Sequence, residues 1–351
     1  MASMYHTNHR LRRALHVHYP AEDGRIVLRT ELDWNTDVEP VSVSADRQTH
    51  EFVLEADRPF LYLKPCLRKG SETLWSNGPN VLVLLTTDDA RQSYPFFRGS
   101  AAAGAMTPVF EVPSARLGRS HKLRAYLPPG YGENPLKRYP VLYMQDGKNL
   151  FFPEEAFLNR EWQVDESLDL LDNMNAADKC IVVGIHSEDR MVDYTLPGYE
   201  AYGRSVVEDI KPYVDGILRT LPQREETAAF GSSLGGVVSF YLGWQYPEVF
   251  GFAACLSSTF SHRDDLIDRV LVDPRRETRF YLDSGWPGDN YEVTLAMAMA
   301  LTERGYVLGR DVVHFAFPLA EHDERAWATR LHLPLQLFSG KIATAARGRF
   351  V

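Results

Sequence analysis

The segment Gly-Ser-Ser-Leu-Gly at residues 231–235 constrains the fold more than any other part of this 351-residue chain. A strand-like run, residues 226–230, precedes it, and a helix-like run, residues 234–244, follows it. Glycines on both sides of a serine let a strand and a helix approach closely around a strained turn that exposes the hydroxyl. Composition alone would give such a match on the order of 0.1 times in a chain of this length. The pattern predicts a nucleophile elbow at Ser233; the alternative is a glycine-rich turn before a packed helix.

Strand-like and helix-like runs alternate from residue 109 onward. The predicted strands are residues 122–127, 141–144, 180–185, 227–230, 252–256, 279–282 and 312–317. The predicted helices are residues 165–175, 202–221, 234–244, 264–272, 291–304 and 323–337. Several strands are short and continuously apolar, as strands buried on both faces are. This order predicts a mostly parallel sheet with helices on both faces and a site at the carboxyl ends of its strands.

The first hundred residues have a different pattern. Short apolar or alternating runs occur at residues 26–28, 41–43, 52–54, 60–63 and 81–85, separated by polar turns with glycine and proline. This spacing predicts a small antiparallel sandwich of the immunoglobulin-like kind. Residues 98–108 are rich in small residues and are predicted to be a linker. We therefore expect an N-terminal β-sandwich with its linker at residues 1–107 and a catalytic domain at residues 108–351.

Composition narrows the choice of partners and compartment. The net charge of −9, with no basic block, argues against nucleic acid or an anionic membrane surface as the main partner. No apolar run approaches the ~20 residues that a membrane span needs. Residues 1–13 lack the apolar stretch of a secretory signal, and Cys66, Cys180 and Cys255 read as buried free thiols. We expect a cytoplasmic protein.

An elbow serine needs a histidine base, and in this class of sheet the order along the chain is serine, acid, histidine. Four histidines follow Ser233: His262, His314, His322 and His332. His262 precedes every candidate acid loop, His314 lies inside a predicted strand, and His332 lies within the last predicted helix. His322 follows the last strand directly, where a base can reach the serine oxygen at about 2.6–3.2 Å. We predict His322 as the base; the alternative is a histidine that caps a helix.

The acid that orients the histidine should follow the preceding strand. Two residues qualify in the segment 280–289, Asp283 at the predicted strand end and Asp289 beyond the turn. We favour Asp289, because a loop can carry it beneath the imidazole, and keep Asp283 as the alternative acid. The residue that is not the acid is expected to stabilise the turn.

The negative oxygen that forms on a reacting carbonyl needs two backbone N–H donors. One is the residue after the nucleophile, here Leu234, and the other comes from a loop after an earlier strand. Gly147 and Lys148 lie in such a loop, with Gly147 expected to permit the turn and the N–H of Lys148 expected to point inward. Read alone, Asp146-Gly147 is equally typical of an ordinary reverse turn.

These residues also carry a resemblance. The segments are 138–151 (Arg-Tyr-Pro-Val-Leu-Tyr-Met-Gln-Asp-Gly-Lys-Asn-Leu-Phe), 231–236 (Gly-Ser-Ser-Leu-Gly-Gly), 245–251 (Gln-Tyr-Pro-Glu-Val-Phe-Gly) and Glu321-His322 followed by Trp327. Together they resemble the putative-esterase family, which includes enterochelin esterases, feruloyl and acetylxylan esterases and mycolyltransferases. The likeness spans about residues 115–340. It implies that Ser233 is the nucleophile, that His322 is the base, and that residues 146–148 form the oxyanion loop.

The resemblance leaves the acid open. Family members often show Gly-x-x-Asp in this loop, whereas this chain has one more residue between Gly285 and Asp289. Some siderophore esterases of the family work with a Ser–His dyad. The N-terminal region is similar in placement to the β-sandwich that precedes the catalytic domain in enterochelin esterases.

Candidate pocket residues come from the same segments. Arg190 and Tyr194 resemble the family's Arg-x-x-x-Tyr segment near the cleft, although a structural ion pair would explain Arg190 equally well. Trp286 lies in the acid loop and is a candidate pocket wall, with burial against a helix as the alternative. Phe151 is a candidate for the pocket floor or for the core. No cluster of metal ligands accompanies His16 and His18, so no metal or cofactor is expected.

These inferences converge on an α/β-hydrolase fold that carries a serine carboxylic-ester hydrolase acting on a small-molecule ester. Siderophore, aryl, feruloyl and acetyl esters are the candidate substrates. Acyl transfer on the same scaffold and a non-catalytic binding protein with a hydrolase fold are the alternatives. The sequence leaves a homo-oligomer open.

Overall fold

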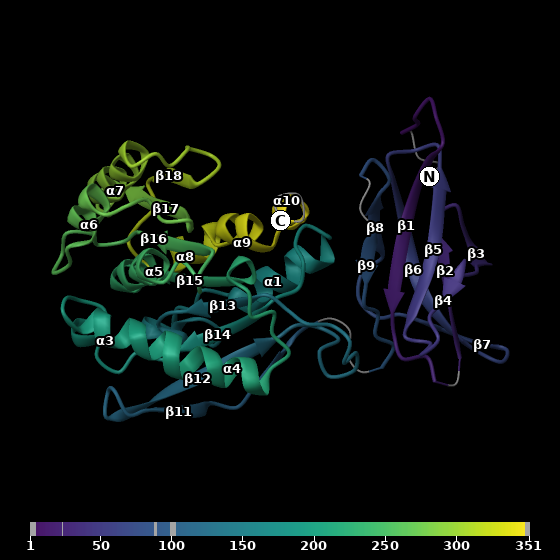
Figure 1. Cartoon of the computed structure of the whole chain (residues 1–351), viewed down its shortest axis with the longest axis horizontal. Helices are drawn as coiled ribbons and strands as arrows, with labels where there is room; N and C mark the ends of the chain where they lie inside the picture. Colours follow the sequence, from purple (N-terminus) through teal and green to yellow (C-terminus); the bar gives the residue numbers. More distant parts are fainter. Residues whose placement is uncertain (1–4, 23, 88–89, 99–102, 348–351) are drawn as a thin grey trace. The chain divides into compact units, whose positions relative to one another are not determined.

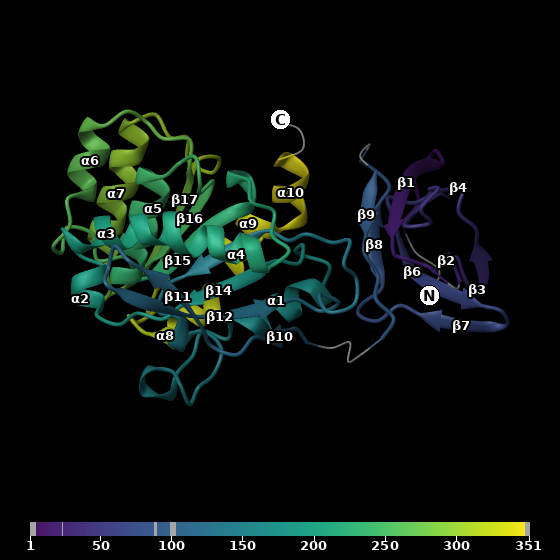
Figure 2. The same ribbon diagram turned by 60° about the horizontal axis from the view of Figure 1, so that its bottom comes forward.

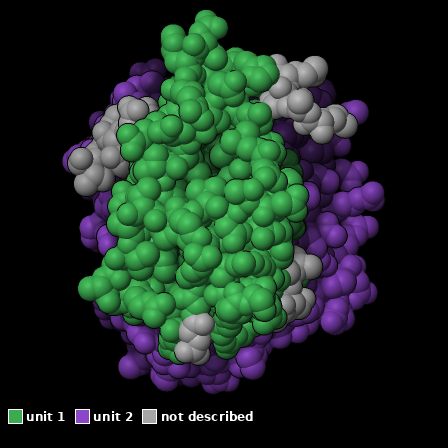
Figure 3. Space-filling view, turned by 90° about the vertical axis from the view of Figure 1, so that its right-hand side faces the viewer, with its two compact units in different colours: residues 1–104, 129–138, 172–175 green, residues 105–128, 139–171, 176–351 purple. Residues whose placement is uncertain are grey.

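The computed structural model describes residues 5–22, 24–87, 90–98 and 103–347. The chain divides into two compact units, drawn in two colours in Figure 3. Unit 1 comprises Met1–Gly104, Pro129–Arg138 and Asp172–Asn175, and unit 2 comprises Ala105–Pro128, Tyr139–Leu171 and Ala176–Val351. The division expected at residue 107 places the segments 129–138 and 172–175 in the second domain, whereas their contacts group them with unit 1. Of the predicted linker, residues 99–102 lie outside the described residues.

Unit 1 is built from two small, mainly antiparallel sheets (Figure 1). Its strands are β1 (Leu11–His18), β2 (Arg25–Thr30), β3 (Asp33–Val38), β4 (Ser42–Val43), β5 (Thr49–Ala56), β6 (Phe60–Lys69), β7 (Glu72–Trp75), β8 (Val81–Leu84) and β9 (Arg91–Ser93). One sheet has the order β4-β5-β1-β9, and the other has the order β3-β2-β6-β7 with β8 also paired to β6. Alternate residues of β1 and β5 are buried, and one apolar core joins side chains of both sheets, among them Leu15, Phe52 and Leu63. The expected N-terminal antiparallel β domain is confirmed.

The segment Pro129–Arg138 belongs to unit 1 through two polar side chains. Glu133 accepts hydrogen bonds from the Tyr19 hydroxyl and from the backbone N–H groups of Phe97 and Arg98. Asn134 is almost fully buried, and its Nδ2 donates to the carbonyl oxygens of residues 18 and 95, each at 2.8 Å. Its Oδ1 accepts from a backbone N–H two residues later. One amide side chain thus satisfies three backbone groups.

Asn134→Ala should lower the free energy of unfolding of unit 1 by about 1–3 kcal/mol, because buried carbonyl oxygens lose their donor. Denaturant titration measures the change. Asn35→Ala, at an exposed position of β3, is the control and should stay within about 0.5 kcal/mol of the parent chain. Equal stability of the Asn134→Ala variant and the parent would contradict the role given to this amide.

Unit 2 is a nine-stranded sheet (Figures 1 and 2). Its strands are β10 (Ala105–Met106), β11 (Phe110–Ser114), β12 (Arg119–Leu127), β13 (Val141–Met144), β14 (Ile181–Ile185), β15 (Thr227–Ser232), β16 (Phe252–Leu256), β17 (Arg279–Trp286) and β18 (Val312–Pro318). The order is β10-β12-β14-β13-β15-β16-β17-β18, with β11 also paired to β12. All neighbours from β14 to β18 are parallel, and β12 is antiparallel to β14. The predicted sheet class is confirmed.

Helices cover both faces of this sheet. They are α1 (Val164–Asn173), α2 (Arg190–Asp193), α3 (Gly198–Ser205), α4 (Lys211–Ile217), α5 (Leu234–Gln245), α6 (Leu266–Val272), α7 (Tyr291–Glu303), α8 (Glu324–Arg330), α9 (His332–Ser339) and α10 (Lys341–Arg347). Short turns of 3-10 helix lie at Gly147–Asn149, Phe157–Asn159 and Arg224–Glu226, and a π-helical turn at Val206–Ile210. Side chains of α1, α8 and α9 share one core with the sheet, which includes Phe230, Trp327 and Phe338. On the other face Phe240 of α5 stacks on Phe280 of β17.

The observed elements differ from the predicted ones at points that matter for the site. β17 continues to Trp286 instead of ending at residue 282, so Asp283 lies inside the strand. The predicted helix 202–221 is interrupted by the π-helical turn before α4. The predicted helix 323–337 is two helices, α8 and α9, that meet at Leu331. None of the described helices has the length and apolar character needed to cross a membrane.

Candidate active site

Ser233 lies in the tight turn between β15 and α5. Its backbone angles, φ 55° and ψ −126°, fall in a region that residues other than glycine rarely adopt. A Cβ on Gly231 would lie 2.3 Å from the carbonyl oxygen of Gly235, and a Cβ on Gly236 would lie 2.0 Å from the Ser258 hydroxyl. Only glycine fits at residue 231, because the backbones of the strand and the helix touch there, and Gly236 lies against a side chain of the loop that follows β16. The turn combines the strain and the close contacts expected of a nucleophile elbow.

Pairing between neighbouring strands brings the other candidate residues to the same edge of the sheet. Ser232 pairs with Leu256 of β16, and Leu256 pairs with Asp283 of β17. The carboxyl ends of these strands are therefore level, and Ser233 begins the loop on one of them. His322 lies four residues after β18 ends at Pro318, at this same edge.

His322 and Asp289 form a close pair. The Nδ1 of His322 lies 2.7 Å from Oδ1 of Asp289, and the imidazole also contacts the Trp327 ring edge-on at 5.1 Å between centroids. The carboxylate side chain is fully buried, whereas the imidazole is about one-third exposed (32%). Within the described part of the chain, no hydrogen bond joins Ser233 to His322. Such contacts are often long in enzymes without substrate and tighten when it binds.

Four donors surround the Asp289 carboxylate. Oδ1 faces the His322 Nδ1 and accepts from the N–H of Asn290 at 2.8 Å. Oδ2 accepts from the Ser257 hydroxyl at 2.5 Å and from the N–H of Gly285 at 2.6 Å. Burial alone would raise the pKa of this carboxyl, but these hydrogen bonds outweigh burial and hold its pKa below the ordinary value. An ionised carboxylate only accepts, so the Nδ1 of the imidazole carries the proton and Nε2 is left free as a base.

Asp283 has a different set of partners. It is fully buried inside β17, where Oδ2 accepts from the Tyr281 hydroxyl at 2.7 Å and from Nε of Arg330 at 3.1 Å. Oδ1 accepts from the N–H of Ser257 at 3.2 Å. Burial raises the pKa of Asp283 against the opposing effect of the guanidinium and these donors. Of the two candidate acids, Asp289 is the one that the structure pairs with His322.

Behind Asp289 lie Ser257 and Arg330, which were not predicted as site residues, and Trp327, which was noted only as part of the family resemblance. Ser257 follows β16 directly, and its hydroxyl also meets Nε1 of Trp327 at 3.0 Å and Nη2 of Arg330 at 2.6 Å. The position of Ser257 at the carboxyl end of a middle strand was an available signal. A second signal was that Arg330 follows Trp327 by three positions, which puts both side chains on one side of a helix.

The predicted oxyanion loop packs tightly on the sheet. A Cβ on Gly147 would lie 2.6 Å from the carbonyl carbon of Gly184 and 2.7 Å from Cδ2 of His186, so glycine is required for close packing. The left-handed conformation of the turn, φ 55°, belongs to Asp146 and not to Gly147. Among the described residues, the N–H groups of Lys148 and Leu234 have no protein acceptor. Both are thus available as donors to a bound oxyanion.

An ion pair fixes Asp146 in this loop. Its Oδ1 lies 2.9 Å from Nε of Arg190, and its Oδ2 accepts from Nη2 of Arg190 at 3.2 Å. The Tyr194 hydroxyl accepts a hydrogen bond from the N–H of Asp146 at 3.3 Å. The carboxylate also faces the elbow, because a Cβ on Gly235 would lie 2.9 Å from Oδ2. Burial raises the pKa of Asp146, while Arg190 opposes the rise.

Two of the predicted pocket residues line no open surface. Tyr194 is fully buried (0% exposed) and Phe151 nearly so (3%), because Tyr194 supports the Asp146 turn and Phe151 packs in the core above Gly184. Phe151 thus lies in the core, which was one of its two predicted positions, and a pocket role for either residue stays a prediction. Trp286 is about half exposed (52%) at the end of β17, and Arg190 is partly exposed beside Asp146. For these two, a substrate contact stays a prediction.

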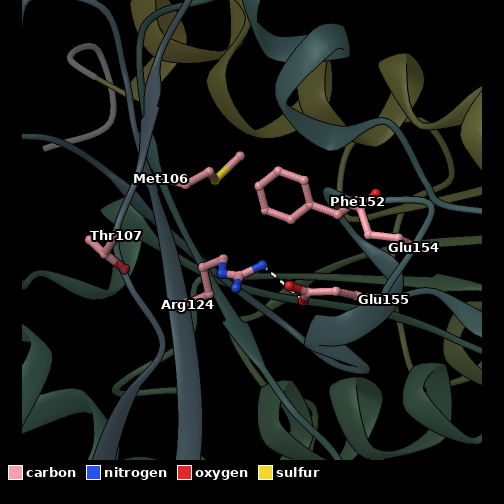
Figure 4. A pocket seen from close by; sticks show the side chains of 6 residues that line it. All are labelled: Met106, Thr107, Arg124, Phe152, Glu154 and Glu155. Atoms are coloured by element: carbon pink, nitrogen blue, oxygen red, sulfur yellow. Dashed lines mark hydrogen bonds and ion pairs between the residues drawn. The ribbon is translucent and has the colours of Figure 1, made fainter.

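A shallow pocket lies elsewhere on unit 2, beyond the oxyanion loop (Figure 4). Its lining residues are Met106, Thr107, Arg124, Phe152, Glu154 and Glu155. The Arg124 guanidinium is already paired, with Glu155 at 2.8 Å and with the Phe152 ring, whose centroid lies 4.8 Å from Cζ. The pocket includes none of the predicted site residues, so we give it no part in the candidate site.

One acidic cluster was not anticipated. Carboxylate oxygens of Glu161, Asp165 and Glu166 lie within 4.8 Å of one another at the start of α1. Burial, followed by repulsion between the carboxylates, raises the pKa of Glu161 and of Asp165 to about 7. Acidic groups near a protein surface often gather in this way without an ion, and we assign none to them.

Arg190→Met should destabilise the protein in a pH-dependent way. Without the guanidinium, the folded-state pKa of Asp146 rises further above its unfolded value. A carboxyl shifted upward costs stability only above its unfolded pKa, so the loss should be small near pH 4 and grow toward pH 7. We expect a loss of about 1–2 kcal/mol at pH 7.5 from denaturant titration, since one partner of a partly buried pair is removed.

Arg310→Met is the matched control, because Arg310 is about two-thirds exposed (68%) in its ion pair with Asp311. Its removal should change the free energy of unfolding by less than about 0.5 kcal/mol. A loss for Arg190→Met that did not depend on pH would contradict the assigned role of Asp146.

With the fold and the site described, comparison with known proteins adds the family. The chain matches the family model described as "Putative esterase" over residues 114–333. The uncharacterized protein YbbA of Bacillus subtilis is 23% identical over 155 residues, which cover 40% of this chain and 58% of YbbA. The chain thus spans little more than half of this curated relative.

Solved structures show the same fold. A ferulic acid esterase superimposes with a TM-score of 0.57 at 18% identity, over 68% of this chain and 98% of that one. The enterobactin esterase FES of Shigella flexneri, crystallised in the presence of enterobactin, gives a TM-score of 0.55 at 16% identity, over 94% of this chain and 93% of that one. The α/β-hydrolase fold is confirmed by these likenesses, and the family match over residues 114–333 shows that this chain belongs to the putative esterase family.

Proposed function

We propose that this protein hydrolyses small carboxylic esters, with Ser233 as nucleophile, His322 as base and Asp289 as the orienting acid. The observation that carries the proposal is the pairing of His322 with a carboxylate that accepts from four donors, at the same sheet edge as the strained serine turn. In this arrangement Nδ1 of the imidazole carries the proton, so Nε2 is unprotonated and can accept the proton of the serine. Family membership supports the same reaction class.

The reaction proceeds in two halves. In the first, Nε2 of His322 takes the proton of Ser233 as Oγ attacks the ester carbonyl, and the resulting imidazolium gives that proton to the departing alcohol. This leaves an acyl group on Ser233. In the second half, His322 takes a proton from water, the hydroxide attacks the acyl carbonyl, and the proton returns to Ser233 as the acid leaves.

The negative oxygen formed in each half would be stabilised by the N–H groups of Leu234 and Lys148. Both are free among the described residues, and the two loops that carry them meet where Asp146 faces Gly235. Losing one such donor typically costs about 3–4 kcal/mol of transition-state stabilisation. The Asp146–Arg190 pair contributes by holding the Lys148 loop in register with the elbow.

Two observations, the names of the fold neighbours and the exposed ring of Trp286, favour an ester with an aromatic group as the substrate. Of the fold neighbours named above, one is a ferulic acid esterase and the other an enterobactin esterase, and the first name indicates an ester with an aromatic acyl group. The half-exposed Trp286, close to the acid loop, offers an aromatic surface for such a group. A panel of aryl, feruloyl, acetyl-sugar and catecholate-lactone esters tests this, and product analysis with an added sugar acceptor distinguishes hydrolysis from acyl transfer.

Ser233→Ala should lower the turnover of a p-nitrophenyl ester by about 10⁴-fold or more, because the serine, histidine and acid act together in catalysis. It should also abolish covalent labelling by a fluorophosphonate. Ser232→Ala, at the neighbouring buried serine of β15, is the matched control and should keep both labelling and most of the turnover. Near-parental turnover of the Ser233→Ala variant would overturn the proposed mechanism.

Asp289→Asn and Asp283→Asn should separate kinetics from stability. Asp289→Asn removes the acceptor that fixes the imidazole tautomer and should lower kcat by up to about 10⁴-fold. Asp283→Asn leaves the buried Arg330 without the nearer of its two carboxylate partners, with only Asp289 at 3.8 Å, and should lower the free energy of unfolding by about 3–5 kcal/mol, measured by denaturant titration. A large kinetic loss in folded Asp283→Asn, with Asp289→Asn unaffected, would reverse the assignment of the acid.

A further inference from the structure

Ser257 is an unusual serine in a position that the proposed reaction does not use directly. It is fully buried, it follows β16 at the carboxyl end, and its φ of 44° lies in the left-handed region. Its N–H donates to the carbonyl oxygen of Asp283 at 2.8 Å, and its own carbonyl oxygen accepts from Nδ2 of Asn290 at 2.7 Å. Backbone strain at a non-glycine residue often accompanies a functional role.

The hydroxyl of Ser257 has its single proton directed by its partners. A serine hydroxyl offers one donor and two acceptor positions. Nε1 of Trp327 and Nη2 of Arg330 carry only donors, and they fill both acceptor positions at 3.0 and 2.6 Å. The proton of Ser257 is left with one acceptor, Oδ2 of Asp289 at 2.5 Å. The hydroxyl is therefore a fixed donor to this carboxylate.

The two groups that orient Ser257 are themselves held in place. Arg330 is buried (2% exposed), its Nε donates to Asp283, and its guanidinium lies over the Phe317 ring at 5.1 Å. Trp327 packs edge-on against the His322 imidazole. Both belong to α8, so one helix supplies both donors to Ser257.

We propose that Ser257 is a positioning residue for the candidate acid: its oriented hydroxyl holds Asp289 in the rotamer that presents Oδ1 to His322. The inference rests on the proposed function, because it gives Asp289 the role of orienting acid. Ser257 acts through Asp289, and among the described residues no hydrogen bond joins Ser257 to Ser233. Its effect should appear in the step that forms the imidazolium, which means in kcat more than in KM.

The neighbouring Ser258 provides a matched control. It is also fully buried, and its hydroxyl has no hydrogen-bond partner among the described residues. Replacing Ser257 or Ser258 by alanine therefore removes the same atom from the same loop. Only the first replacement removes a donor from Asp289.

Ser257→Ala should lower kcat by about 10–100-fold with KM changed less than about twofold, since a small displacement of an orienting group is costly. It should also move the low-field proton resonance of the hydrogen bond between His322 Nδ1 and Asp289, which nuclear magnetic resonance detects without substrate. Ser258→Ala should leave kcat and the resonance unchanged. Parental kcat and an unmoved resonance in Ser257→Ala would reject the proposal, as would equal losses in both variants.

Trp327→Phe tests the same link from its other side and replaces Ser257→Ala if that variant does not fold. It removes the Nε1 donor and should lower kcat about 3–10-fold and move the same resonance. In a Ser257→Ala background it should add no further loss, because phenylalanine keeps a ring beside His322 and the Nε1 donor reaches Asp289 only through the Ser257 hydroxyl. Parental kcat and resonance in Trp327→Phe, or full additivity of the two losses, would overturn the proposal.

Failure of the proposed function gives a different pattern. If the parent chain neither hydrolyses esters nor reacts with a fluorophosphonate, the reaction class is wrong. The low-field resonance, assigned by its loss in Asp289→Asn, still reports whether Ser257 orients that carboxylate.

Discussion

A carboxylate can be buried without protonation only where donors fill its acceptor positions, and Asp289 meets this condition with groups from three parts of the chain. Gly285, near the end of β17, and Asn290 come from the segment around Asp289 itself, Ser257 follows β16, and His322 lies in the loop after β18. The hydrogen bonds that keep the pKa of Asp289 low are thus the same bonds that join the segments following β16, β17 and β18 at the edge of the sheet. The same set of hydrogen bonds therefore fixes the position of the Asp289 carboxylate and keeps it ionised.

Close backbone contacts have a comparable effect on the nucleophile side. Gly231 and Gly235 bring β15 and α5 together around Ser233, and Gly147 lets the preceding loop lie directly on Gly184. Between these two contacts, the carboxylate of Asp146 faces Gly235 and pairs with Arg190. The serine turn, with the N–H of Leu234, and the loop that carries the N–H of Lys148 are therefore fixed to each other by packing and by one ion pair, without a bound substrate.

The sequence predicted the sheet class and the serine turn because both depend on local patterns. Strand–helix alternation and the glycine spacing around Ser233 can be read from neighbouring residues. The choice between Asp283 and Asp289 remained open because it depends on where β17 ends, and strand ends are poorly marked in sequence. Ser257 and Arg330 escaped notice because their roles arise from contacts between residues more than seventy positions apart. In unit 1, β1 was missed because its alternation is interrupted by basic residues, as in Leu11–His18.

The segment Pro129–Arg138 has a consequence for how this protein can be divided. It lies between two strands of the hydrolase sheet, yet its Glu133 and Asn134 satisfy backbone groups of the first hundred residues. A chain cut at residue 104 would carry this segment away from every one of those partners and expose both polar side chains without their acceptors and donors. The N-terminal β domain therefore cannot be exchanged between relatives by itself. An exchange that keeps its backbone groups satisfied must also replace the segment Pro129–Arg138, which lies elsewhere in the sequence.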